Sequence, residues 1–352
     1  MNHNRQLLPR RVLSRRDFIA LATASAAVLL TFPGCQQDEA GRAGVTEAEE
    51  TVVPSLDADT RSAVIDDLLH LLKEKYVFLD VAAKIDEDIR ERQSNGEYDA
   101  ITDRAAFADT LTRHLQDVSH DEHLEVSPKA IDKAGPPGPP PPTSAEDPSG
   151  FLYRAERLPG NVGYMDLRIF AAPQSGAGAA AASAMNELNN TDALIFDITQ
   201  NSGGDPKMVA LLCSYLFGPE PVHLNDIRWR SGDYIEVEEF WTQPEVEGAR
   251  YGQDKLVYVL TSHTTFSAAE EFAYDLQALG RATIVGETTQ GGANPGQPFE
   301  LPVDFTVLIP IGEAVNPTTK TNWEGTGVKP DIAVPQEKAL ETARNAVLEK
   351  LN

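Results

Sequence analysis

The sequence contains very little cysteine, since only Cys35 and Cys213 carry a thiol among 352 residues. So few thiols cannot build an internal disulfide framework, which excludes the class of small secreted domains held together by disulfides. The fold must therefore depend on a hydrophobic core, and the scarcity of thiols suits folding in a reducing cytosol before export. Cys213 lies inside the apolar run MVALLCSYLF and is predicted to be a small core residue.

Basic residues are also scarce, because 30 Lys and Arg stand against 54 Asp and Glu and give a formal net charge of −24 at pH 7. A surface this acidic repels phosphate groups. Nucleic acid is therefore excluded as a partner that binds through its backbone. Hydrophobic residues make up 41% of the chain, as in an ordinary soluble globular protein.

Long hydrophobic runs are missing as well. The run IALATASAAVLLTF, residues 19–32, has fourteen residues and is too short to span a bilayer. It follows a basic segment and ends at PGC, so residues 1–35 are predicted to be a signal peptide. The five arginines that precede the run are Arg5, Arg10, Arg11, Arg15 and Arg16.

Two motifs refine this signal peptide. SRRDFI has the paired arginines and large apolar residue of twin-arginine export. TFPGC resembles a lipoprotein cleavage box, although Phe32 stands where Leu is usual, so Cys35 is predicted to be lipidated. The alternative is a soluble secreted protein in which Cys35 has no role. We expect an exported, lipid-anchored envelope protein in the periplasm, and Gln36 after the cysteine favours the outer membrane.

The rest of the chain divides into four parts. Residues 36–54 are small and polar and are predicted to be a flexible tether. Apolar residues recur at helical spacing in 55–130, which predicts three helices, the first capped by Asp59 or Thr60. Residues 131–150 are rich in proline and form a linker. Residues 151–352 alternate between predicted strands and helices, so the second domain belongs to the α/β class.

Ser267 stands in TSHTTFSAAEEF, between an apolar strand and an amphipathic helix. SAAE fits a capping box, in which Ser267 and Glu270 exchange hydrogen bonds with the backbone at the helix start. A helix N-terminus also offers a positive dipole and free N–H groups to a nucleophile. The Ser267 hydroxyl is therefore predicted to be either a helix cap or a nucleophile.

A nucleophilic serine needs a base, and three histidines are candidates. His120 and His123 flank two acids in SHDEH, while His263 lies four residues before Ser267 and would require a turn to fold back. Two histidines at this spacing without a helix are a weak metal motif, so we expect no metal. His123 begins the alternating piece HLEV, which places it at the start of a strand.

A glycine turn follows the predicted buried strand in IFDITQNSGGDP. Gly203 and Gly204 allow close approach of a ligand and expose N–H groups, so this turn could supply half of an oxyanion hole. It could equally be a simple connection to a helix with Asp205 as cap and Pro206 at the first position.

Taken together, these motifs and NWEGTGVKPDIAV resemble the tail-specific, or C-terminal-processing, serine peptidase family. The likeness spans roughly residues 55–350 and is closer to the branch with the tricorn core and the interphotoreceptor retinoid-binding protein repeats. It implies a ClpP/crotonase-like α/β core with an N-terminal three-helix subdomain. The family pattern implies Ser267 as nucleophile, His123 as base and Glu324 as orienting acid. The N–H of Ala268 and one from Gly203 or Gly204 match the oxyanion hole.

Several positions depart from the family pattern. TTQGGANP, about 25 residues after the serine, holds no lysine, which excludes a Ser-Lys dyad. Glu122 replaces the serine that precedes the base, and is expected to raise the pKa of His123. Thr199 replaces an arginine. The segment before residue 161 is too short for a PDZ domain, so we expect none.

Three functions from different classes remain open. The first is an envelope serine endopeptidase that cleaves peptides or unfolded proteins without a cofactor. The alternative is a non-catalytic binding protein for a lipid or apolar ligand on the same fold. The third hypothesis is a scaffold or assembly module.

Overall fold

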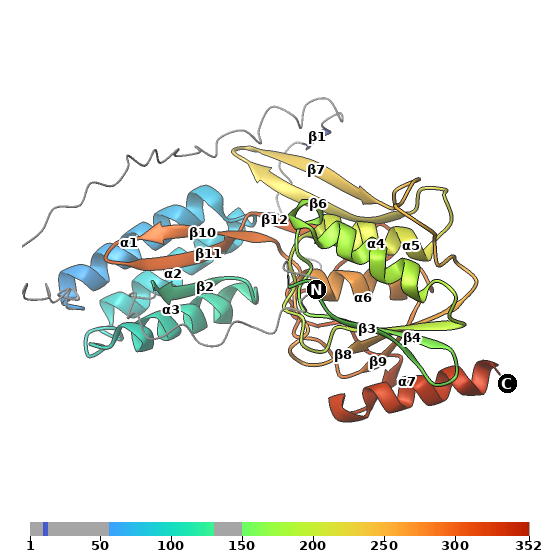
Figure 1. The fold of residues 1–352 in the computed structure, drawn as a ribbon. Helices are drawn as coiled ribbons and strands as arrows, with labels where there is room; N and C mark the ends of the chain where they lie inside the picture. The colour runs from blue at the N-terminus through green and yellow to red at the C-terminus, as the bar shows by residue number, and fades with distance from the viewer. Residues whose placement is uncertain (1–9, 13–55, 130–149, 352) are drawn as a thin grey trace, which may run out of the picture.

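The computed structural model describes residues 10–12, 56–129 and 150–351, which form two lobes side by side (Figure 1). Most of the predicted signal peptide 1–35, including Cys35 as the predicted lipidation site, lies outside the described residues, as do the predicted tether 36–54 and residues 131–149 of the predicted Pro-rich linker.

Three helices of the first lobe follow the predicted helical spacing. They are α1 (Ala58–Lys75), α2 (Leu79–Ser94) and α3 (Arg104–Ser119). The predicted cap of α1 was wrong, because Asp57 is the capping residue and its Oδ1 accepts from the N–H of Thr60 at 2.9 Å. An acid one residue before the first turn satisfies a backbone donor that an acid inside the helix cannot reach.

The first lobe also contains a small antiparallel sheet. Its strand order is β10 (Gly296–Leu301), β11 (Phe305–Pro310) and β2 (Glu125–Pro128). Alternate residues of β11 enter the helical core, where the ring of Phe305 lies 6.0 Å from that of Phe107. A hairpin from the C-terminal half of the chain thus completes this lobe. The sequence had predicted only a three-helix subdomain here.

The second lobe is built on a six-stranded sheet. Its order is β13-β9-β8-β5-β4-β3, and all neighbours are parallel except β3 and β4. The central strands are buried on both faces, as their continuous apolar runs require. The strands are β3 (Leu152–Leu158), β4 (Val162–Leu167), β5 (Ala193–Asp197), β8 (Leu256–Thr261), β9 (Thr283–Gly286) and β13 (Ile332–Ala333).

Helices cover both faces of this sheet (Figure 1). One face carries α4 (Ala177–Leu188), α5 (Pro206–Leu216) and α6 (Ala268–Ala278), after a short 3-10 helix at Pro173–Ser175. The other face carries α7 (Gln336–Leu351), as expected from its amphipathic sequence. The predicted α/β class is confirmed.

A third sheet lies over α4 and α5, in the order β1-β7-β6-β12 (Figure 1). It contains the predicted hairpin of β6 (His223–Ser231) and β7 (Tyr234–Trp241), together with β1 (Arg10–Val12) and β12 (Gly312–Val315). Because β12 directly follows β11, one continuous segment passes from the first lobe back to the second.

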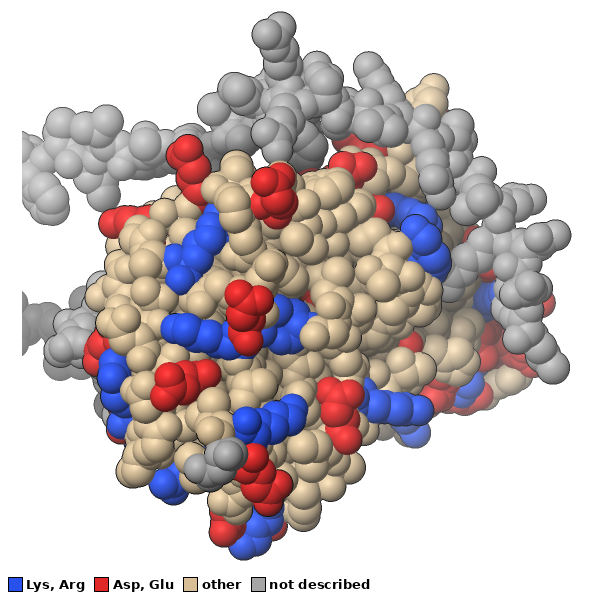
Figure 2. Space-filling view, turned by 90° about the vertical axis from the view of Figure 1, so that its right-hand side faces the viewer, with Lys and Arg blue, Asp and Glu red and all other residues tan. Residues whose placement is uncertain are grey.

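Charged residues are mixed on the face of the second lobe that points away from the first. Figure 2 shows acidic and basic side chains there, interspersed among uncharged ones, with no basic patch on that face. None of the helices in the described ranges is long and apolar enough to cross a membrane.

Candidate active site

Ser267 lies where the chain leaves β8 and enters α6. Its backbone has φ 55° and ψ −124°, a conformation that non-glycine residues rarely adopt. The Glu270 carboxylate accepts from the Ser267 N–H at 2.9 Å, so this half of the predicted capping box is formed. The hydroxyl is half-buried and lies at the edge where the neighbouring parallel strands β5 and β8 end.

His123 reaches this hydroxyl from the other lobe. It lies between α3 and β2, and its Nε2 is 3.2 Å from Ser267 Oγ although 144 residues separate the two. The imidazole packs on the ring of Phe266, with centroids 4.5 Å apart. The structure therefore brings together the serine and the histidine that the family pattern had paired.

Burial controls the basicity of His123. Removing the imidazole from water disfavours its charged form and lowers its pKa to about 4. The expectation that Glu122 raises this pKa was wrong, since no charged neighbour contributes to the shift. The main chain of Glu122 instead donates to Glu324 Oε1 at 3.1 Å.

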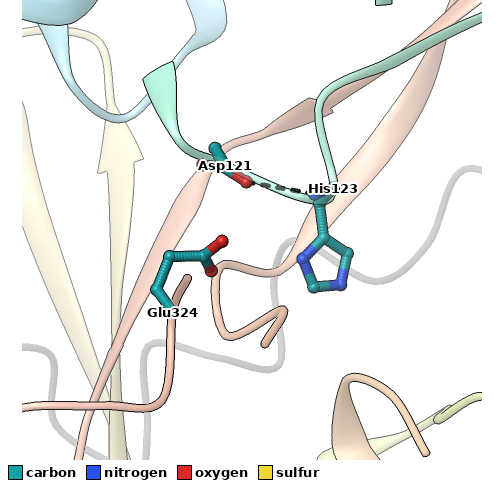
Figure 3. Close-up of side chains that lie close together, drawn as sticks. All are labelled: Asp121, His123 and Glu324. Atoms are coloured by element: carbon teal, nitrogen blue, oxygen red, sulfur yellow. Dashed lines mark hydrogen bonds between the residues drawn. The ribbon is translucent and has the colours of Figure 1, made fainter. Parts of the chain in front are cut away.

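The Glu324 carboxylate is held mainly by the backbone. Beyond the bond from Glu122, its Oε2 accepts from the N–H groups of Ala293 at 2.6 Å and Asn294 at 3.0 Å. His123 Nδ1 is buried and has no hydrogen-bond partner among the described residues. Figure 3 shows that this side of the imidazole faces the Glu324 carboxylate.

Asp121 is the residue of this site that sequence reasoning missed. Its Oδ2 accepts from Tyr76 Oη and Asn294 Nδ2, each at 3.0 Å, and its Oδ1 accepts from the His123 N–H at 3.2 Å. Burial raises the pKa of Asp121 to about 6, and burial together with the nearby Asp121 raises that of Glu324 to about 8. The two acids of SHDEH could have indicated an acidic residue at this site. Nothing in that motif showed whether the side chain of Asp121 or that of Glu122 points into the interior.

The glycine turn packs directly against Ser267. Gly203 has φ +110°, and a Cβ placed on it would lie 2.7 Å from the Cβ of Ser267. Its N–H donates to Asn201 Oδ1 at 2.9 Å and is therefore occupied. The N–H groups of Gly204 and Ala268 have no partner within the described ranges. Of the two glycines, Gly204 thus supplies the open donor.

Glu270 joins the serine to the loop that follows β9. Besides the Ser267 N–H, its carboxylate accepts from Thr289 Oγ1 at 2.5 Å, the N–H of Gly291 at 2.7 Å and the N–H of Gly292 at 2.8 Å. The sequence indicated only the capping role of Glu270. Its contacts with residues 289–292 are distant in sequence and form only in the folded loop.

The other two candidate histidines do not reach the serine. His120 ends α3 in the left-handed conformation, with φ 54°. His263 is exposed, and its Nδ1 lies 3.0 Å from Glu287 Oε2. His123 is therefore the candidate base among the three.

The fold and the Ser–His pair define the class of serine peptidases. The chain belongs to peptidase family S41, since the model of that family and the model of its N-terminal domain together match most of the chain, the first of them at residues 161–334. The preceding residues 52–154 match the N-terminal domain of this peptidase in eukaryotic IRBP.

Solved structures of low sequence identity share the fold. A candidate peptidase from Parabacteroides merdae is 17% identical, with a TM-score of 0.59 over 82% of this chain and 97% of that one. Mature CPAF complexed with lactacystin is 13% identical, with a TM-score of 0.53 over 84% and 98%. The tricorn protease is 13% identical, with a TM-score of 0.50 over 83% of this chain and 37% of its own.

The close approach of Gly203 to Ser267 gives a testable prediction. Gly203→Ala should lower the free energy of unfolding by roughly 3 kcal/mol or more, because it adds a steric collision to an unfavourable φ. Gly232→Ala is the matched control, since Gly232 has φ +61° and nothing within 4 Å of its missing Cβ. It should cost only about 1–2 kcal/mol. Urea unfolding measures both, and equal losses would contradict the packing described here.

Proposed function

We propose that this peptidase is an endopeptidase in which Ser267 is the nucleophile, His123 the general base and Glu324 the acid that stabilises the base. The observation that carries the proposal is the 3.2 Å contact between His123 Nε2 and Ser267 Oγ at the start of α6. A base within hydrogen-bond reach of a hydroxyl is the geometry that activates a serine.

Acylation begins when His123 Nε2 takes the proton of Ser267 as Oγ attacks the carbonyl carbon of the substrate. The negative charge that develops on the carbonyl oxygen is stabilised by the open N–H groups of Ala268 and Gly204 beside the serine. The positive end of the α6 dipole adds to this stabilisation. The protonated imidazole then gives its proton to the leaving amine, and the acyl-enzyme remains.

The imidazolium formed in this step is buried, so it needs a compensating charge. The Glu324 carboxyl group faces the Nδ1 side of the ring (Figure 3). Its pKa is raised to about 8, and in its ionised form it supplies this charge through space. Deacylation follows the same route, with His123 activating a water molecule that attacks the acyl carbon.

The family implies a peptide or protein as substrate. We infer that an extended, unfolded segment binds, because Ser267 and His123 come from different lobes and meet at their junction. A backbone laid across this junction would contact both residues.

Replacement of the serine and of the histidine tests the assignment. Ser267→Ala and His123→Ala should each lower kcat on the order of a millionfold, because a nucleophile and its base act as one unit. Glu324→Gln should cause a smaller loss, since Glu324 makes no direct hydrogen bond to the ring. Cleavage of an unfolded protein and a mixed peptide library, read by mass spectrometry, measures the effect.

His263→Ala is the matched control, because His263 lies only four residues before Ser267 yet is exposed. It should retain the activity of the wild type. Activity that survives Ser267→Ala would overturn the assignment. A folded wild type that cleaves nothing would instead support the binding function, in which the same replacement leaves ligand affinity intact.

The pKa of His123 predicts the acid limit of the reaction. Only the neutral imidazole accepts the serine proton, and a pKa of about 4 keeps it neutral at pH values where an ordinary histidine is protonated. Ionisation of Glu324, with a pKa of about 8, can add a second acid limb, so the limb set by His123 is measured in Glu324→Gln. In this variant the acid limb of kcat/KM should lie well below pH 6.5. Two peptides without titratable side chains should give the same limb, and a limb at 6.5 or above contradicts the described environment of His123.

We further propose that the peptidase is exported and held in the cell envelope by a lipid on Cys35. The support is the twin-arginine pattern, the fourteen-residue apolar run and the box around Cys35. Cleavage before Cys35 removes five arginines and one aspartate and changes the formal charge from −24 to −28, so the chain gains no electrostatic attraction to anionic lipid and relies on the acyl anchor.

Cys35→Ala should move the protein from the membrane fraction to the soluble fraction. Cys213→Ala is the matched control, since Cys213 is buried and should leave the distribution unchanged. Immunoblots of fractionated cells measure both. A wild type found only in the soluble fraction would exclude the anchor.

A further inference from the structure

Asp121, His123 and Glu324 form a compact set of donor atoms in the interior. One ligand atom from each lies within 4.8 Å of the others, and Figure 3 shows the three side chains converging. Imidazole nitrogen with carboxylate oxygen is a donor set that suits Zn²⁺ and related ions. The two acids come from different lobes, so the set exists only in the assembled molecule.

The two carboxylates lack a cationic partner among the described residues. Every hydrogen bond that they accept there comes from a neutral donor, either a backbone N–H, a phenol or an amide. Two buried acids side by side repel each other unless a cation or proton lies with them. A divalent ion would balance both negative charges at once.

The imidazole supplies an independent indication. His123 is 6% exposed, and its Nδ1 is buried without a hydrogen-bond partner in the described ranges. An unsatisfied nitrogen in the interior is costly, and here it is oriented towards the carboxylates (Figure 3). Nδ1 therefore has room to bind a ligand. Nε2 does not, because it faces Ser267.

The surroundings of the acids resemble those of metal ligands. Each carboxylate oxygen has two lone-pair sites, and Asp121 Oδ1 and Glu324 Oε1 each accept a single hydrogen bond, so each keeps one acceptor site open. Such outer contacts normally orient ligating carboxylates. A four-coordinate ion needs donors about 3.3 Å apart for bonds of about 2.0–2.1 Å, so the three donor atoms, which lie within 4.8 Å of one another, would move closer together when an ion binds.

We propose that Asp121, His123 Nδ1 and Glu324 form a site for a divalent ion of the Zn²⁺ class, which inhibits the peptidase when bound. The inhibition rests on the proposed function, whereas the binding does not. An ion on Nδ1 forces the ring proton onto Nε2, which then donates to Ser267 instead of accepting from it. The ring can no longer act as base, and Glu324 is no longer available to the imidazolium.

Binding is tested on the Ser267→Ala protein, purified without a histidine tag and treated with EDTA. Titration with Co²⁺ should produce a visible absorption band that Zn²⁺ removes. In double variants that carry Ser267→Ala, a second change of Glu324→Gln or Asp121→Asn should weaken Co²⁺ binding at least about tenfold. His123→Ala in the same background should abolish the absorption band. Circular dichroism melts confirm folding, and the carboxylate variants decide the result if the His123 variant does not fold.

His223→Ala and His263→Ala are matched controls, because each removes a histidine already paired with an acid elsewhere. Neither should change the titration. Absence of the band, or its loss in a control variant and not in the site variants, would overturn the proposal.

The wild type then tests the inhibition. Zn²⁺ should suppress cleavage and EDTA should restore it, while binding without inhibition would refute the switch. Absence of cleavage in EDTA-treated wild type is a failure of the proposed function, and the cobalt titration still decides the metal site.

Discussion

The buried carboxylate of Glu270 is the interaction on which the active site depends. It accepts three backbone N–H groups and one hydroxyl, from the start of α6 and from residues 289–292. A buried carboxylate without such donors is strongly unfavourable, so these groups must stay in place together. Burial raises the Glu270 pKa to about 7 despite the four bonds. One side chain thereby holds both the serine and the loop that packs beneath the imidazole.

Local periodicity was sufficient to predict most helices and strands. The helices of residues 58–119 and the buried strands β5 and β8 follow directly from apolar spacing, and Asp205 with Pro206 starts α5 as expected. The placement of residues 296–310 was not predictable in this way. Their alternation indicates a half-buried hairpin, but it cannot reveal that the partner core lies nearly 200 residues earlier.

The site was predictable only in part. The family pattern selected Ser267 and His123, and the structure brings them together, whereas their spacing in sequence carries no such information. The inward orientation of Asp121 and the low pKa of His123 both arise from burial at the junction of the lobes. The sequence suggested that Glu122 would raise the pKa of His123, because the two residues are adjacent. A sequence shows which residues are neighbours, but it does not show that burial removes the imidazole from water.

The strand that follows His123 has a single neighbour in its sheet, β11, with Ser127 opposite Thr306. During translation the histidine segment therefore leaves the ribosome long before the strand that supports it. We expect that a nascent chain which has reached Ser267 lacks a competent Ser267–His123 pair until residues 305–310 have followed. Peptidase activity would then arise only near the end of synthesis.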